Sequence, residues 1–274
     1  MVWRSIVASR MTLPEIVRMK ETKQRIVSVT AYDYTFAQLL DRAGVDLILV
    51  GDSLGMVVQG HETTLPVTVD HMIYHTSAVV RGVQRAMVIC DLPFGICQSS
   101  KEVVMDAAIR ILKESGCDGV KIEGGVAIAE TIRFLTRQRI PVVAHVGLTP
   151  QSVKFFGGFK VQGRDEAAAR QIVADAVAVA EAGAFAVVLE GIPANLAAEI
   201  TAELSIPTIG IGAGVACDGQ VLVLYDLLGL YEDIKPRFVK QYMSGGANIR
   251  AALEQYAQEV REGQFPGPEH GFSS

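Results

Sequence analysis

The sequence predicts a single α/β domain built as a (β/α)8 barrel of the TIM type. Eight short runs rich in Val, Ile and Leu alternate with helical patterns between about residues 26 and 229. Such runs, bounded by Gly or Pro, are typical of parallel strands that are covered on both faces. Eight βα units in a chain of this length indicate a closed barrel. A doubly wound open sheet is the alternative, but its Gly-rich first turn is missing from Tyr32–Thr35.

Each element follows from this alternation. The expected strands are Ile26–Asp33, Val45–Ser53, Ala86–Phe94, Gly119–Gly125, Pro141–Gly147, Phe185–Gly191, Ile206–Gly212 and Gln220–Leu227. The expected helices are Thr35–Ala43, Val69–Val83, Glu102–Ser115, Ala127–Gln138, Glu166–Ala182 and Ala194–Leu204. Three of these helices are followed by Gly44, Gly116 and Gly183, as is usual where a helix ends.

The single domain is expected to span residues 1–274, with the barrel at about 24–230. A further helix is expected before residue 24, and a helical extension at about 231–263. The last ten residues, rich in Gly, Pro and Ser, are expected to be mobile.

Bulk composition excludes several classes of protein. Half of the residues are hydrophobic and the net charge is −5, with no basic cluster, which argues against nucleic acid or anionic membrane partners. The four cysteines show no Cys-x-x-Cys spacing, so we expect reduced thiols in a cytoplasmic protein. No apolar run has the length of a membrane span.

In four of the predicted strands, the apolar run ends on an acidic residue. These residues are Asp52, Asp91, Glu123 and Glu190. A carboxylate at the last position of a strand stands where the backbone leaves the core. Four on separate strands indicate that several carboxylates meet at one end of the sheet, which is where α/β folds place their chemistry.

Lys121 and Glu123 are two positions apart on one strand and therefore point the same way. Burying a Lys and a Glu inside a barrel costs free energy unless the two charges pair with each other or with a bound ligand. A structural ion pair is one interpretation. With Asp52 and Asp91 nearby, three carboxylates and one Lys favour a bound divalent cation, and oxygen ligands suit Mg²⁺ or Mn²⁺.

The remaining candidates each have two interpretations. Ser53 follows Asp52 and would hydrogen-bond an anionic substrate, or would simply form a turn or helix cap. Glu190 is a general base held away from the metal cluster, or a solvent-facing carboxylate. His145 lies at a strand end and is more often a hydrogen-bonded wall residue than a catalyst.

Two Gly-rich stretches lie at the end of a strand and in a loop. The segment at 210–214 predicts a tight βα turn rather than a dinucleotide fingerprint, because its third Gly is misplaced. The loop at 155–164 has the glycines, aromatics and cations of a lid over an anion; a solvated loop or an oligomer contact is the alternative. His61, His71 and His75 lack the spacing of a zinc motif.

Longer motifs make the chain resemble the ketopantoate hydroxymethyltransferase family from about residue 12 to 265. These motifs are Thr30-Ala-Tyr-Asp-Tyr34, Val50-Gly-Asp-Ser-Leu-Gly-Met56, Gly60-His61 with Thr64-Leu-Pro-Val-Thr68, Asp91-Leu-Pro-Phe94, Val120-Lys-Ile-Glu-Gly124, His145-Val-Gly-Leu-Thr-Pro-Gln-Ser152, Phe156-Gly-Gly158 with Val161-Gln-Gly-Arg164, and Ile209-Gly-Ile-Gly-Ala-Gly214 with Asp218-Gly-Gln220. The first eleven residues match nothing in that pattern.

The resemblance implies a (β/α)8 barrel of the phosphoenolpyruvate/pyruvate-utilising group, a cytoplasmic homodecamer that uses one Mg²⁺ per subunit and 5,10-methylenetetrahydrofolate. It implies hydroxymethyl transfer to 3-methyl-2-oxobutanoate, giving 2-dehydropantoate, in pantothenate and coenzyme A biosynthesis. The implied site residues are metal ligands Asp52, Asp91 and Glu123, substrate contacts Asp52, Ser53, Asp91 and Lys121, and catalytic base Glu190.

Three alternatives remain beside this interpretation. Another metal-dependent lyase or mutase of the same barrel group would use the same enolate chemistry on a small oxoacid. A Schiff-base aldolase would use Lys121 as nucleophile. A metal-tuned anion sensor would keep the pocket without turnover.

Overall fold

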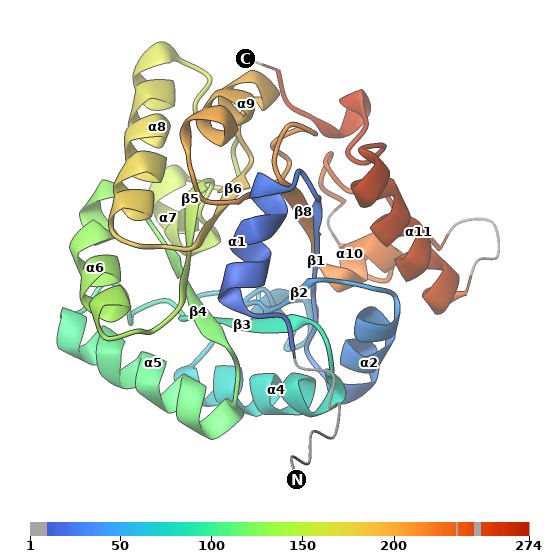
Figure 1. Ribbon diagram of the computed structural model, residues 1–274, viewed down its shortest axis with the longest axis horizontal. Helices are drawn as coiled ribbons and strands as arrows, with labels where there is room; N and C mark the ends of the chain where they lie inside the picture. Colours follow the sequence, from blue (N-terminus) through green and yellow to red (C-terminus); the bar gives the residue numbers. More distant parts are fainter. Residues whose placement is uncertain (1–9, 234, 244–247, 274) are drawn as a thin grey trace, which may run out of the picture.

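Eight parallel strands close into a barrel in chain order in the computed structural model, which describes residues 10–233, 235–243 and 248–273 (Figure 1). The strands are β1 (Ile26–Thr30), β2 (Leu47–Val50), β3 (Met87–Asp91), β4 (Gly119–Glu123), β5 (Val142–Gly147), β6 (Ala186–Glu190), β7 (Thr208–Ile211) and β8 (Gly219–Leu222). The helices are α1 (Leu13–Glu21), α2 (Tyr34–Arg42), α3 (Leu54–Val57), α4 (Val69–Gly82), α5 (Lys101–Ser115), α6 (Ala129–Arg137), α7 (Val153–Phe156), α8 (Glu166–Glu181), α9 (Ala194–Glu203), α10 (Leu224–Leu228) and α11 (Ile249–Glu262). The predicted barrel is confirmed.

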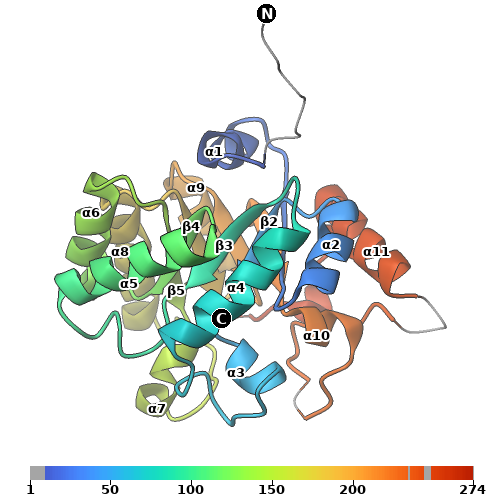
Figure 2. The same cartoon turned by 90° about the horizontal axis from the view of Figure 1, so that it is seen from below.

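The strands separate two apolar regions. Residues such as Val120 and Ile122 pack under the outer helices, whereas Met87 and Ile89 belong to a second cluster inside the barrel. Ile16 of α1 joins that inner cluster, so α1 closes one end of the barrel. Figure 2 shows α1 at that end and α3 and α7, which follow β2 and β5, at the other. The carboxyl ends of the strands therefore face the α3 and α7 side.

Capping side chains and glycines with positive φ set the ends of several helices. Asp33 caps α2 by accepting the Phe36 N–H at 2.9 Å, so this residue starts a helix instead of extending the preceding strand. Gly44, Gly116 and Gly183 adopt φ values of +84°, +76° and +100° just after their helices, as predicted.

Most predicted strand and helix ends differ from the structure by one to three residues, and three predictions differ by more. The eighth strand stops at Leu222 because the Leu224 N–H donates to Thr30 Oγ1 at 2.9 Å and α10 begins there. The turn at 210–214 connects β7 directly to β8, so no helix follows it. In the extension predicted at about 231–263, the described helix covers only Ile249–Glu262, and the described part of 231–243 is turns and bends around Pro236.

The end of the chain also differs from expectation. Up to residue 273 it packs on the barrel instead of lying loose: Phe265 is buried, and the Phe272 carbonyl accepts the Ala194 N–H at 3.0 Å. All four cysteines are free and buried, in agreement with the predicted thiols. Among the described helices, none has the length and apolarity needed to cross a membrane.

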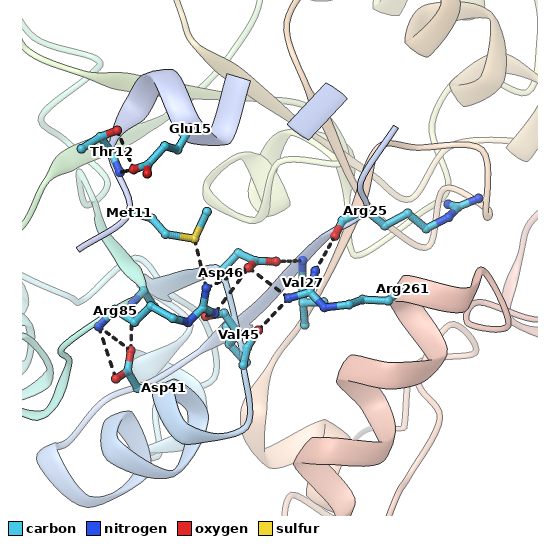
Figure 3. Close-up of polar contacts among 12 residues, drawn as sticks. Met11, Thr12, Glu15, Arg25, Val27, Asp41, Val45, Asp46, Arg85 and Arg261 are labelled. Carbon is cyan, nitrogen blue, oxygen red and sulfur yellow. Dashed lines mark hydrogen bonds and ion pairs between the residues drawn. The ribbon is translucent and has the colours of Figure 1, made fainter. Parts of the chain in front are cut away.

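A polar cluster around Asp46 joins the start of β1, β2 and β3 at the α1 end (Figure 3). Asp46 is 2 % exposed, and its Oδ2 accepts the Val27 N–H at 3.0 Å. Its Oδ1 lies 3.3 Å from Arg85 Nη1 and 3.0 Å from Arg261 Nη2. Since Arg261 belongs to α11, one carboxylate ties the last helix to three strands.

Asp46→Asn is expected to lower the free energy of unfolding by about 1–3 kcal/mol, because two guanidinium groups lose their ionised partner. Denaturant unfolding measures the loss. Asp70→Asn is the control: Asp70 pairs with Arg110 at 2.8 Å but is 77 % exposed, so its loss should stay below about 1 kcal/mol. Equal losses of unfolding free energy in the two variants would contradict a stabilising role for the buried Asp46 cluster.

Candidate active site

A cavity of about 390 Å³ opens at the carboxyl ends of the strands. All six predicted site residues line it, together with His145 and Asp226. The six are Asp52, Ser53, Asp91, Lys121, Glu123 and Glu190. Asp91, Glu123 and Glu190 are the last residues of β3, β4 and β6, and Asp52 lies two residues beyond β2. Closure of the barrel is what brings these distant residues together.

Lys121 lies among the carboxylates. Its Nζ is 3.0 Å from Asp91 Oδ1 and 3.9 Å from Glu123 Oε1, and the side chain is almost fully buried. The register explains the first contact, because Asp91 pairs with Lys121 across β3 and β4. Burial alone would lower the pKa of Lys121, but Asp91, Glu123 and Asp52 together raise it above its ordinary value. Lys121 is therefore an ammonium group at neutral pH.

The acidic side chains repel one another. Burial first, and then the charge of Asp91, raise the pKa of Asp52 to about 7. Burial likewise raises the pKa of Glu123 well above its ordinary value, although Lys121 opposes the shift. Asp91 remains better compensated, since its Oδ2 accepts the Asp52 N–H at 3.0 Å. One ammonium group does not neutralise this cluster.

Gln151 is a site residue to which the sequence analysis assigned no role. Its backbone N–H donates to Glu123 Oε2 at 3.0 Å, and its Nε2 donates to Asp52 Oδ2 at 2.8 Å and to the Leu92 carbonyl at 2.9 Å. It thus fixes carboxylates from two different strands. The signal was its place in the motif at 145–152, but no spacing rule indicates a contact across 99 residues.

His145 lies between Lys121 and Glu190. Its Nδ1 is 3.3 Å from Lys121 Nζ, and its Nε2 is 3.2 Å from Glu190 Oε2 without hydrogen-bond alignment. Burial and the charge of Lys121 lower the pKa of His145, so the ring is neutral. An ammonium can only donate, which makes Nδ1 the acceptor and leaves the ring hydrogen on Nε2, facing Glu190.

Ser53 does not cap α3 with its side chain. Its Oγ lies 2.9 Å from the Tyr32 hydroxyl and lines the cavity. Burial raises the pKa of Tyr32, so this partner is a neutral hydroxyl group. The position of Ser53 fits the predicted substrate contact better than the alternative of a helix cap.

The loop at 155–164 contributes to the mouth in part. Phe159 and Val161 line the cavity, whereas Phe155 points away and is 89 % exposed. His71 and His75 have ordinary local roles: His71 is linked to Thr68 in a capping arrangement, and His75 Nδ1 lies 2.7 Å from the Tyr32 carbonyl.

The donor set fits a hard divalent cation. Asp52, Asp91 and Glu123 offer only carboxylate oxygens, and the buried Asp91 Oδ1 has the Lys121 ammonium group at 3.0 Å but no further hydrogen bond from a described residue. Within residues 10–233, 235–243 and 248–273, no three Asp, Glu, His or Cys side chains are already gathered as a ligand cluster. Mg²⁺ usually binds one or two carboxylates and keeps several waters, so it does not require such a cage.

This arrangement defines a class of protein, a (β/α)8 barrel with acidic residues at its carboxyl mouth. Phosphoenolpyruvate phosphomutase from Streptomyces platensis subsp. rosaceus superposes with a TM-score of 0.60 at 15 % identity, covering 80 % of this chain and 83 % of that one. The 2,3-dimethylmalate lyase of the PEP mutase/isocitrate lyase superfamily gives 0.54 at 20 % identity, covering 72 % and 70 %. At such low identity the likeness concerns the fold.

Sequence comparison is more specific. The sequence model of the ketopantoate hydroxymethyltransferase family matches residues 10–268. The 3-methyl-2-oxobutanoate hydroxymethyltransferase of Magnetococcus marinus is 60 % identical over 263 residues, covering 96 % of this chain and 98 % of that protein. The enzyme of that name from Heliobacterium modesticaldum is 55 % identical, covering 97 % and 96 %. The chain belongs to the ketopantoate hydroxymethyltransferase family and is an enzyme, a transferase, as the resemblance predicted.

The raised pKa of Asp226, on α10, should make the stability of the folded protein depend on pH. Burial, and then the charge of Glu190, raise its pKa from 3.8 to about 7. A carboxyl group with a raised folded-state pKa stabilises the fold fully below its unfolded pKa, and this contribution is lost as the pH rises through the folded value. The Asp226→Asn variant has no titrating group at this position. Its free energy of unfolding should therefore rise by about 1–3 kcal/mol relative to that of the unchanged protein as the pH increases from about 4 to about 8.

Urea unfolding across this pH range, without divalent ions, measures the difference. Asp106→Asn, an exposed position on α5, is the control and should give a difference that does not vary with pH. A flat profile for Asp226→Asn as well would contradict the raised pKa.

Proposed function

We propose that this enzyme transfers a hydroxymethyl group from 5,10-methylenetetrahydrofolate to 3-methyl-2-oxobutanoate. Water is consumed, and 2-dehydropantoate and tetrahydrofolate are released, as a step of pantothenate and coenzyme A biosynthesis. The observation that carries the proposal is the name shared by relatives at 55–60 % identity over nearly the whole chain. The charges of the cavity supply the physical support.

The reaction requires removal of the C3 proton of the oxoacid. Glu190 suits this task, because its side chain lines the cavity and is 14 % exposed, and its neighbour at 3.2 Å is the neutral ring of His145. Asp91, by contrast, is paired with Lys121, and Asp52 and Glu123 are held by Gln151. Among the described residues, no Lys or Arg forms an ion pair with Glu190, which leaves its carboxylate free to act on a substrate.

Negative charge then develops on the oxoacid oxygens. The Lys121 ammonium group, buried and fixed by Asp91, offers a preorganised positive charge that needs no reorientation. Asp52, Asp91 and Glu123 would hold Mg²⁺, one per subunit, which when bound supplies Lewis-acid stabilisation of that charge. Ser53 Oγ, which lines the cavity, would hydrogen-bond the carboxylate of the oxoacid.

A Schiff-base route through Lys121 is less well supported. A nucleophilic amine must lose its proton, whereas the surrounding carboxylates outweigh burial and raise the pKa of Lys121. The cytoplasmic location and the homodecamer remain predictions from the family resemblance.

Glu190→Gln should lower turnover by about 10²–10⁴-fold, because the amide cannot accept the C3 proton. The direct measurement is exchange of the C3 proton of 3-methyl-2-oxobutanoate with solvent, with Mg²⁺ present and folate omitted. Glu130→Gln on α6, where Glu130 is 86 % exposed, is the control. Exchange at a near-normal rate in Glu190→Gln would remove Glu190 from this role.

Removal of divalent ions with a chelator should abolish both exchange and transfer, and added Mg²⁺ should restore them. Asp52→Ala and Asp91→Ala should abolish activity and also the Mg²⁺ binding seen by titration calorimetry. Asp106→Asn should bind Mg²⁺ like the unchanged enzyme. Full activity of either alanine variant in the presence of chelator would refute the metal assignment.

A further inference from the structure

The cavity has an inner and an outer part. The inner part holds the charged residues at the strand ends, and a small oxoacid bound there fills only a fraction of about 390 Å³. The outer part is formed by residues beyond the strands and is mainly apolar. Its aromatic members are Phe159, Tyr231, Phe238 and Phe272. We call these four residues, with Asp226, the outer chamber.

The aromatic wall of the outer chamber is firmly built. A Cβ atom at Gly212, in the turn after β7, would lie 2.8 Å from Phe238 and 3.0 Å from Phe272. Both rings therefore lie directly against that turn, in space that a larger residue would fill. The Arg237 guanidinium lies 6.0 Å from the centroid of the Phe272 ring. These contacts hold the chain end across the mouth.

Asp226 is the acidic residue of the outer chamber. It lies in the first turn of α10 and lines the cavity, and its carboxylate makes no hydrogen bond or ion pair with a described residue. It is also close enough to Glu190 for the two charges to interact. An unpaired carboxylate beside aromatic rings is a recognition element for a flat ring system that carries N–H donors.

We propose that the outer chamber binds the reduced pterin ring of the folate donor, with Asp226 accepting hydrogen bonds from the ring's amino and N–H groups and Phe238 and Phe272 packing on its face. The inference rests on the proposed function, in which a reduced folate carries the one-carbon unit. The adjacent N–H donors on one edge of a pterin match the two oxygens of a carboxylate. Asp226 is near enough to Glu190 for their charges to interact, so a ring held by Asp226 would lie beside the base and the bound oxoacid.

Two variants test the chamber from independent sides, Asp226→Asn at its polar edge and Phe272→Ala at its wall. Titration calorimetry with tetrahydrofolate, without oxoacid, should show a dissociation constant raised at least about tenfold in both. Transfer from 5,10-methylenetetrahydrofolate should fall at least about tenfold more than C3 proton exchange, which needs no folate. Asp106→Asn and Phe155→Ala, the latter at an exposed ring outside the cavity, are the matched controls.

Unchanged tetrahydrofolate binding in both variants would overturn the proposal, as would equal losses of exchange and transfer. Circular dichroism and unfolding midpoints verify that each variant is folded. Because tetrahydrofolate binding is measured without oxoacid, it tests the outer chamber independently of the first half of the reaction. Absence of C3 proton exchange in the unchanged enzyme would refute the proposed function alone.

Discussion

The burial of several like charges around one ammonium group is the constraint on which this site depends. Lys121 lies 3.0 Å from Asp91 and 3.9 Å from Glu123, inside a barrel whose interior holds a large apolar cluster. Removing these groups from water is expensive, and their attraction offsets the expense only in part. The remaining repulsion appears as the raised pKa values of Asp52 and Glu123, with burial as their main cause. A site of this kind is stabilised by any further positive charge that enters it.

The chain separates this cluster from Glu190 by means of neutral residues. Gln151 holds Asp52 and Glu123 through its amide and backbone N–H, and His145 stands between Lys121 and Glu190. Neither residue adds charge. Glu190 and the charged cluster are thereby kept within one small cavity, each with different neighbours.

The strands and most of the site residues could be predicted from the sequence, because their positions follow from the periodicity of apolar residues. The alternation of faces along a strand placed Lys121 and Glu123 together, and the apolar runs gave all eight strands. Gln151 could not be found in this way, since its contacts depend on the short turn at 150–152 and on residues far away in the chain. The strand end at Leu222 was missed for a similar reason: Thr30, on another strand, accepts the hydrogen bond that starts α10.

The chain end shows how composition can mislead. Gly, Pro and Ser at the last ten positions indicate mobility, yet Phe265 and Phe272 are anchored by tertiary contacts that no local pattern reveals. This anchoring has a practical side. An affinity tag or fluorescent protein joined directly after Ser273 would start beside the rim of the reaction chamber, because Phe272 lines that chamber. Arg10 pairs with Asp118, which immediately precedes β4, at the opposite end of the barrel. Fusions for purification or imaging are therefore better joined ahead of Arg10.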